Sequence, residues 1–296
     1  MNHIKDQIHC ERAYRMGLSG KGIGVAVLDT GIFLHRDFDS RVTGFADMVN
    51  RRNFAYDDCG HGTHICGIIG GSGRMSGGRY SGIAPGCNLI MVKVLDRKGN
   101  GYSSDVLAGI SWVLERKEQL GIRILNISVG ACSKRGMSEN SALVKGVNRA
   151  WDAGLVVVVA AGNNGPRTMS ITTPGISRKV ITVGCSDDDR EVLVGGNRMV
   201  DYSGRGPTAA CVCKPDVVAP GCGVVSCASD FGRYTIKSGT SMSTPVVSGA
   251  IALLLEKYPD MTNRDVKLKL MESAMDIGLP KNQQGWGLLD IKRLLE

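Results

Sequence analysis

The sequence predicts an α/β fold, a three-layer sandwich whose central sheet is mainly parallel and carries helices on both faces. Short runs of apolar residues alternate with longer helix-like segments along the chain. This order is typical of a parallel sheet that is covered on both sides. The 40 glycines lie mostly at the ends of these segments, as expected for tight loops around a compact sheet.

The individual elements follow from the periodicity of the apolar residues. We expect strands where apolar residues run without interruption over a short stretch, and helices where they recur at helical spacing. The predicted strands cover 24–29, 41–46, 88–95, 122–128, 155–161 and 180–184, with short strands and turns over 185–235. The predicted helices cover 5–16, 61–70, 103–119, 138–153, 242–257 and 262–275, and a tail ends at Glu296.

The 296 residues are predicted to form one domain, 1–296, in which 1–19 are an N-terminal helix and lead-in. The chain is 43% hydrophobic and 22% charged, and no Pro/Gly/Ser linker or internal repeat divides it. Because the first residues are polar, we expect no signal peptide. No apolar run reaches the roughly 18 residues of a membrane span. With ten cysteines and no export signal, we expect free thiols and a cytoplasmic location.

The positive charge of the chain is scattered along the sequence. The net charge is +8, but the basic pairs Arg51-Arg52, Lys134-Arg135 and Arg178-Lys179 are isolated, and aromatic residues make up only 5%. Nucleic-acid-binding chains usually gather their basic residues in one stretch. The pattern therefore favours a solvated surface, with no nucleic-acid or membrane partner.

The stretch Ser238-Gly239-Thr240-Ser241-Met242-Ser243-Thr244-Pro245 precedes a long apolar run, Val246–Leu255. Such a run predicts a helix that is buried nearly all round, with Pro245 in its first turn. Ser241 would then lie where a loop enters this helix, close to free backbone N–H groups and to the positive end of the helix dipole. Alone, a serine in this position is usually a helix cap.

Three other stretches place a polar side chain at the end of a buried strand or at the start of a buried helix. A buried strand ends in Asp29, a small-residue helix begins at His61, and a valine-rich strand runs into Asn163. A serine hydroxyl such as that of Ser241 is a poor nucleophile until a base removes its proton, and a neutral imidazole can do so near neutral pH. A carboxylate can hold that imidazole in the required tautomer, and an amide can stabilise an oxyanion.

Other motifs in the chain are typical of different sites, but each is incomplete. His61 and His64 could form a metal pair, but no carboxylate lies at helical spacing from them. Leu28-Asp29-Thr30-Gly31 matches one half of an aspartic-protease site, which needs two such aspartates. The glycines at 20–24 precede a strand, whereas a dinucleotide fingerprint follows one, and the Gly/Ser loop at 71–82 lacks the Lys-Ser/Thr ending of a phosphate loop.

The four stretches, in the order Asp, His, Asn, Ser, resemble the subtilisin-like serine proteases. The resemblance extends from about Gly20 to about Asp290. It is strongest to the intracellular, alkaline-type bacterial members, which carry stretches similar to Gly44–Asn50 and Tyr202–Thr208. It implies the subtilisin-like version of the three-layer sandwich predicted above.

The resemblance also implies a function, that of a serine endopeptidase that acts through an acyl-enzyme. Asp29, His61 and Ser241 would form the catalytic triad, and Asn163 would donate to the oxyanion together with the backbone N–H of Ser241. The substrate would be a polypeptide whose backbone pairs with the chain as an added strand, with a preference for medium or large uncharged side chains. The substrate-binding residues implied in this way are Gly99, Asn100, Gly101, Ser128, Val129, Gly130, Ala160, Ala161, Gly162, Asn164 and Thr172.

Two departures from the resembled family concern metals and folding. Relatives hold calcium with an aspartate after the first strand, which Asp37 matches, and with an Asn-rich loop after the histidine helix. Residues 71–80 contain no Asp, Glu or Asn. Calcium is therefore possible but unsupported by this loop, and we predict no required cofactor and no metal ligands. The lack of a visible prosegment leaves a separate inhibitor or folding-assistant segment as a possible partner.

Two alternatives to a general peptidase remain at this point. The chain could be a dedicated processing protease with one substrate, which the sequence cannot distinguish from an enzyme of general protein turnover. It could also be a catalytically silent binding protein of the same fold. Loss of a triad residue would mark the silent protein, and the sequence retains Asp29, His61 and Ser241.

Overall fold

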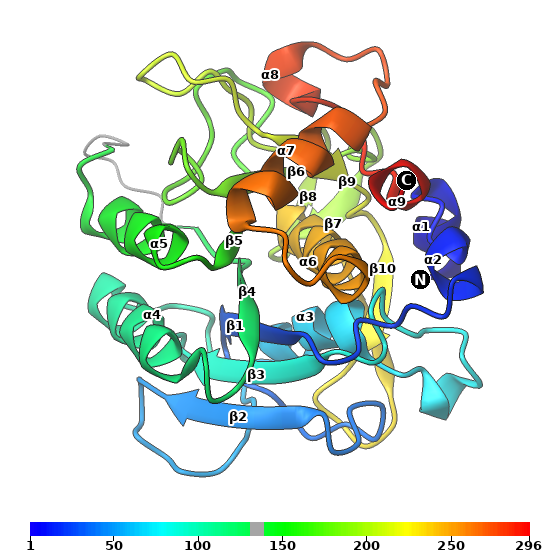
Figure 1. Cartoon of the computed structure of the whole chain (residues 1–296). Helices are drawn as coiled ribbons and strands as arrows, with labels where there is room; N and C mark the ends of the chain where they lie inside the picture. The colour runs from blue at the N-terminus through cyan, green and yellow to red at the C-terminus, as the bar shows by residue number, and fades with distance from the viewer. Residues whose placement is uncertain (131–138) are drawn as a thin grey trace.

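The computed structural model describes residues 1–130 and 139–296, and these form an α/β fold around a central sheet (Figure 1). Within the described residues, seven strands pair in parallel in the order β2-β3-β1-β4-β5-β6-β9. The interior strands are rich in Val, Ile and Leu and almost completely buried, as parallel strands with two covered faces should be. The strands are β1 (Gly24–Asp29), β2 (Val42–Asp47), β3 (Asn88–Lys93), β4 (Ile122–Ile127), β5 (Val156–Ala160), β6 (Ile181–Cys185) and β9 (Val217–Ala219).

Helices cover both faces of this sheet, which confirms the predicted three layers. On one face α3 (His61–Gly70) packs against α6 (Thr240–Lys257), and α6 crosses β4, β5 and β6. On the other face α4 (Ser103–Arg116) packs against α5 (Ala142–Asp152) (Figure 1). Every residue of α6 from 242 to 255 is buried, because this helix lies between the sheet and the surrounding elements.

The predicted helix over 5–16 is wrong as one element. The chain forms two short helices, α1 (Asn2–Gln7) and α2 (Glu11–Arg15), with His9 between them at a φ of 53°. The break turns His9 toward the C-terminal segment, where its Nδ1 lies 3.1 Å from an Asp290 carboxylate oxygen. Contacts with the distant end of the chain therefore override the local helical pattern.

The start of α6 also differs from the prediction. The helix begins at Thr240, two residues earlier than expected, so Ser241 lies in its first turn and Pro245 lies beyond that turn. Proline has no N–H, so Pro245 cannot donate to the carbonyl of Ser241 four residues earlier. The helix tolerates this missing hydrogen bond because its residues from 242 to 255 are packed on all sides by the rest of the protein.

The region after β6 contains short strands and turns, as predicted for 185–235. Two antiparallel hairpins form in it, and β9 joins the main sheet. The tail also contains short helices, and Leu288 forms a β-bridge with Val218 of β9. Helix α5 begins at Ala142 and is capped by Ser141, whereas the start predicted at 138 lies outside the described residues. The remaining elements are β7 (Val192–Val194), β8 (Asn197–Met199), β10 (Val224–Cys227), β11 (Tyr234–Lys237), the 3₁₀ turn η1 (Arg74–Ser76), α7 (Asn263–Ser273), α8 (Lys281–Gln284) and α9 (Ile291–Leu294).

The predicted polar residues lie at one edge of the sheet. Asp29 ends β1, Ser128 follows β4 and Asn163 follows β5, and parallel strands place their carboxyl ends together. Helices α3 and α6 begin at the same edge, with His61 and Ser241 in their first turns. In the described part of the chain, no helix is long and apolar enough to cross a membrane.

Candidate active site

Asp29 and His61 are directly hydrogen-bonded. The imidazole Nδ1 lies 2.7 Å from Oδ1 of Asp29, which is completely buried, while the His61 side chain remains 24% exposed. Burial lowers the pKa of His61, but the charge of Asp29 and the hydrogen bond to it outweigh this effect and raise the pKa above its usual value of 6.5. The bond to Asp29 orients the imidazole through Nδ1 and leaves Nε2 available on the side of the cleft that His61 lines.

Asp57 fixes the segment that carries His61. One of its carboxylate oxygens accepts hydrogen bonds from the Thr30 hydroxyl at 2.9 Å and from the N–H groups of Cys59 at 3.1 Å and Gly60 at 2.8 Å. The other accepts the N–H of Thr63 at 2.9 Å and its hydroxyl at 2.5 Å. These bonds join the end of β1 to the start of α3, and satisfy N–H groups that a helix start leaves free. Asp57 was not among the residues predicted for the site.

The Ser241 hydroxyl lies in the same cleft as His61. Its Oγ donates a hydrogen bond of 2.7 Å to the backbone carbonyl of Ser128, at the end of β4. The structure therefore brings the predicted nucleophile and base to one cleft, but the hydroxyl hydrogen bonds to a carbonyl and not to the imidazole.

The side chain of Asn163 is held by Thr240. Its Oδ1 accepts hydrogen bonds of 3.0 Å from both the N–H and the hydroxyl of Thr240, and that hydroxyl in turn accepts the N–H of Gly162 at 3.2 Å. Because the oxygen of the amide is turned to Thr240, its nitrogen points the other way, and Asn163 lines the cleft beside Ser241. Thr240 was not predicted as a site residue. The one signal for it in the sequence is its position directly before Ser241.

Most of the predicted substrate-binding residues line this cleft. Gly130 and Gly162 flank the Thr172 side chain so closely that a Cβ at either position would meet it at 2.4 Å, which places Thr172 at the base of the cleft. Ala161 does not line the cleft, because it is completely buried in a small apolar cluster. The predicted residues that do line it are Gly99, Ser128, Val129, Gly130, Ala160, Gly162, Asn164 and Thr172, and unpredicted ones are Thr30, Cys59, Leu95, Lys98, Gly195, Lys237 and Thr240.

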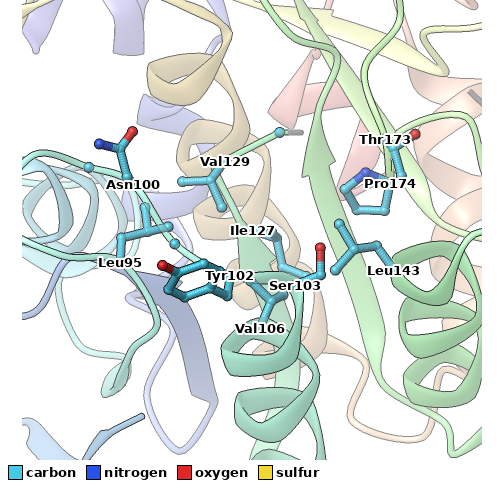
Figure 2. A pocket seen from close by; sticks show the side chains of 13 residues that line it. Leu95, Asn100, Tyr102, Ser103, Val106, Ile127, Val129, Leu143, Thr173 and Pro174 are labelled. Carbon is cyan, nitrogen blue, oxygen red and sulfur yellow. The ribbon is translucent and has the colours of Figure 1, made fainter. Parts of the chain in front are cut away.

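A second pocket adjoins the cleft (Figure 2). The segment Gly99–Gly101 forms one wall, as part of the predicted binding surface, and Leu95 and Val129 line both hollows. Its remaining side chains are mostly apolar and come from β4, the first turns of α4 and α5, and the loop after β5. Sequence reasoning missed these residues, which are Tyr102, Ser103, Val106, Ile127, Leu143, Thr173 and Pro174.

His64 does not share a site with His61. It is completely buried, its Nε2 lies 3.1 Å from the Val224 carbonyl and 3.2 Å from that of Thr235, and burial lowers its pKa to about 3. Among the described residues, neither group of side chains that could hold a metal includes these two histidines. The metal-pair alternative therefore has no geometric support.

Comparison with known proteins agrees with the geometry. The sequence profile of the subtilase family matches residues 20–287. The chain is 42% identical to serine protease AprX of Bacillus subtilis (strain 168), over 90% of this chain and 65% of the length of AprX. It is 32% identical to subtilisin DY of Bacillus licheniformis, over 96% of this chain and 95% of that protein. Thus the chain spans less than two thirds of AprX but nearly all of subtilisin DY.

Solved structures show the same relationship in three dimensions. Sphericase superposes with a TM-score of 0.77 at 30% sequence identity, with 92% of each chain covered. A cold-adapted subtilisin-like serine proteinase superposes with a TM-score of 0.75, also at 30% identity, over 92% of this chain and 90% of that one. With the family profile, the similar proteases and the shared fold in agreement, the chain belongs to the subtilase family of serine peptidases.

Proposed function

We propose that this chain cleaves peptide bonds within polypeptides, with Ser241 as the nucleophile and His61 as the general base. The observation that carries the proposal is the 2.7 Å hydrogen bond between His61 and the buried Asp29, at the edge of the cleft that holds the Ser241 hydroxyl. A carboxylate in this position keeps the imidazole in the tautomer that accepts a proton, and stabilises the imidazolium that results.

The reaction would begin with a rotation of the Ser241 side chain. In the free protein its hydroxyl donates to the Ser128 carbonyl, and a turn about χ1 would bring it toward Nε2 of His61. His61 would take the hydroxyl proton as Oγ attacks the substrate carbonyl, and would then give it to the leaving amine. Water would attack the resulting acyl-enzyme by the same route and release the acid product.

The developing oxyanion would be stabilised by two donors. One is the side-chain nitrogen of Asn163, which Thr240 holds in position, and the other is the backbone N–H of Ser241 in the first turn of α6. The N-terminus of a buried helix adds a positive potential at this point. Donors that are fixed before the reaction need no rearrangement when the charge appears.

The shape of the binding surface supports an extended peptide as substrate. The segment Gly99–Gly101 can pair with its backbone, since an extended peptide adds readily to exposed backbone groups. The cleft over Thr172 is lined by small residues, which suits a medium or large uncharged side chain. The second pocket around Val106 and Leu143 suits another apolar side chain of the same peptide.

A fluorophosphonate probe, which reacts with activated serines, tests this function. We expect one adduct per chain, mapped by mass spectrometry to Ser241, together with cleavage of a denatured protein. Ser241→Ala should lose both and keep the circular dichroism spectrum of the wild type. Labelling that persists in Ser241→Ala would show that another residue is the nucleophile. A wild-type chain that is folded but neither labelled nor active would be a silent binding protein.

A further inference from the structure

Two thiols and a carboxylate meet just beyond the ends of β6 and β9. The Cys185 Sγ at the end of β6 donates to an Asp187 carboxylate oxygen at 3.1 Å. Cys222, which follows β9, brings its Sγ to the same place, and one potential ligand atom from each of the three residues lies within 4.8 Å of the others. None of these residues is needed for the proposed peptide cleavage.

Tyr202 links the two thiols. Its hydroxyl lies 3.2 Å from Sγ of Cys185 and 3.1 Å from Sγ of Cys222. Cys185 and Tyr202 are buried in a small apolar cluster with Val194, whereas Asp187 and Cys222 are partly exposed. The group is thus buried among apolar side chains on one side and partly exposed to solvent on the other, so an ion can reach it.

We propose that Cys185, Asp187 and Cys222 bind a soft divalent cation such as Zn²⁺, with water in the fourth position. Thiolates and a carboxylate are ligands that Zn²⁺ accepts in a tetrahedral arrangement. With Zn–S bonds of about 2.3 Å, tetrahedral geometry separates two sulfur ligands by roughly 3.8 Å. Since the three ligand atoms lie within 4.8 Å of one another, tetrahedral binding would shorten their separations by about 1 Å or less.

Metal binding at this group would exchange thiol protons for the cation. Binding would release one proton from each cysteine, which leaves two thiolates on the metal. The Tyr202 hydroxyl could then donate to a thiolate, in the way that outer ligands orient metal-bound groups.

A second group of possible ligands in the described chain makes a useful contrast. His35, Asp37 and Cys227 also lie close together, but all three are buried. The carboxylate of Asp37 already accepts the N–H of Met75 at 3.0 Å and the hydroxyl of Tyr234 at 2.7 Å. Oδ1 of Asp187 likewise accepts the N–H groups of Gly221 at 2.7 Å and Cys222 at 3.1 Å. The difference is access, because a cation at Asp37 would have to enter a closed interior, whereas Asp187 and Cys222 are partly exposed.

The test measures cation binding directly. The protein would carry Ser241→Ala to prevent self-cleavage, and Cys211→Ser with Cys213→Ser to remove the exposed thiols. Reduced, anaerobic protein is titrated with Cd²⁺, whose thiolate complexes absorb in the ultraviolet, and with Zn²⁺ by calorimetry. We expect one cation per chain, release of up to two protons, and a higher melting temperature with the cation bound.

Variants assign the site. Cys222→Ser and Cys185→Ser should each weaken binding at least tenfold and reduce the thiolate absorbance. Tyr202→Phe, which keeps all three ligands, should weaken it by about tenfold. Cys59→Ser, at a partly exposed thiol in the cleft, is the matched control and should leave the affinity unchanged. If Cys185→Ser fails to fold, the cation affinity of Cys222→Ser decides whether the site exists, because Cys222 is partly exposed.

Two results would overturn the proposal. One is a cation affinity that is the same in the parent protein and in Cys222→Ser. The other is a Cys185–Cys222 disulfide in protein that is isolated with its thiols blocked at lysis, which would make this group a redox pair. Both results are independent of peptidase activity.

Discussion

The side-chain oxygen of Asn163 accepts two hydrogen bonds from Thr240, one from its N–H and one from its hydroxyl, each 3.0 Å long. Thr240 directly precedes Ser241, so the residue that would position the oxyanion donor is joined to the residue that would carry the nucleophile. Any shift at the start of α6 would move both groups together.

Replacement of Asn163 should affect turnover more than binding. Asn163→Ala is expected to lower kcat by about 10²–10³ with little change in KM, a range known from subtilisin itself and carried over here. Thr240→Val should lower kcat by roughly 3- to 10-fold, because one hydrogen bond of about 1 kcal/mol no longer holds the amide. Thr240→Ser should restore it. A loss confined to KM would mean that Asn163 binds substrate only.

The activity should depend on the protonation of His61. Because the base must be neutral, kcat/KM should rise with pH through a midpoint above 6.5, the direction in which Asp29 moves the pKa of His61. Asp29→Asn should lower that midpoint and reduce kcat by about 10⁴. The raised pKa also means that this pair stabilises the fold below pH 6.5, an effect lost as the pH rises through the folded-state pKa. An unmoved midpoint in Asp29→Asn would assign the titration to another group.

Cys59 should make the enzyme sensitive to thiol reagents. It is partly exposed and lines the cleft with His61, and burial followed by the charges of Asp57 and Asp29 raises its pKa. Few thiolates form, so maleimides should inactivate the enzyme slowly, and more slowly still with inhibitor bound. Cys59→Ser should keep activity and lose most of this sensitivity. Equal inactivation rates in both proteins would point to another cysteine. Cys66 lies on the same helix as His61 but is completely buried, so the exposed Cys211 and Cys213 would be the first candidates.

A buried ion pair should matter for stability. Lys214 donates to Asp216 at 2.5 Å, and Lys267 lies 3.1 Å from the other oxygen of the same carboxylate. Asp216→Asn would leave the Lys214 charge buried and unpaired, so we expect it to lower the free energy of unfolding by about 3–5 kcal/mol. Asp152→Asn, which breaks an exposed pair, should cost less than about 1 kcal/mol. Urea denaturation measures both, and equal losses would contradict this explanation.

Calcium should add little stability. The loop at 71–80 offers only hydroxyl and carbonyl oxygens, and the Asp37 carboxylate already accepts hydrogen bonds from the Met75 N–H and the Tyr234 hydroxyl. Exchange of calcium for a chelator should therefore shift the melting temperature by less than about 2 °C. A shift of many degrees would reveal a strong site that involves other residues.

The sequence by itself was enough to predict the α/β class and the residues proposed for catalysis. Asp29 and Asn163 each end an apolar run, while His61 and Ser241 each begin a buried helix. These are local patterns, and the geometry of a parallel sheet then brings the carboxyl ends of its strands to one edge. Local patterns therefore place these residues at the ends of elements, and the resemblance to the subtilisin-like serine proteases added the catalytic role of each.

Only the tertiary structure showed which residues support that site. The pairing of Thr240 with Asn163 and of Cys185 with Cys222 depends on how segments far apart in the chain pack. The same is true of the second pocket, to which several elements contribute side chains. The single helix predicted over 5–16 failed because His9 turns toward Asp290, 281 residues away. Side-chain periodicity reports which face of an element is buried, but it carries no information about which distant residue lies against that face.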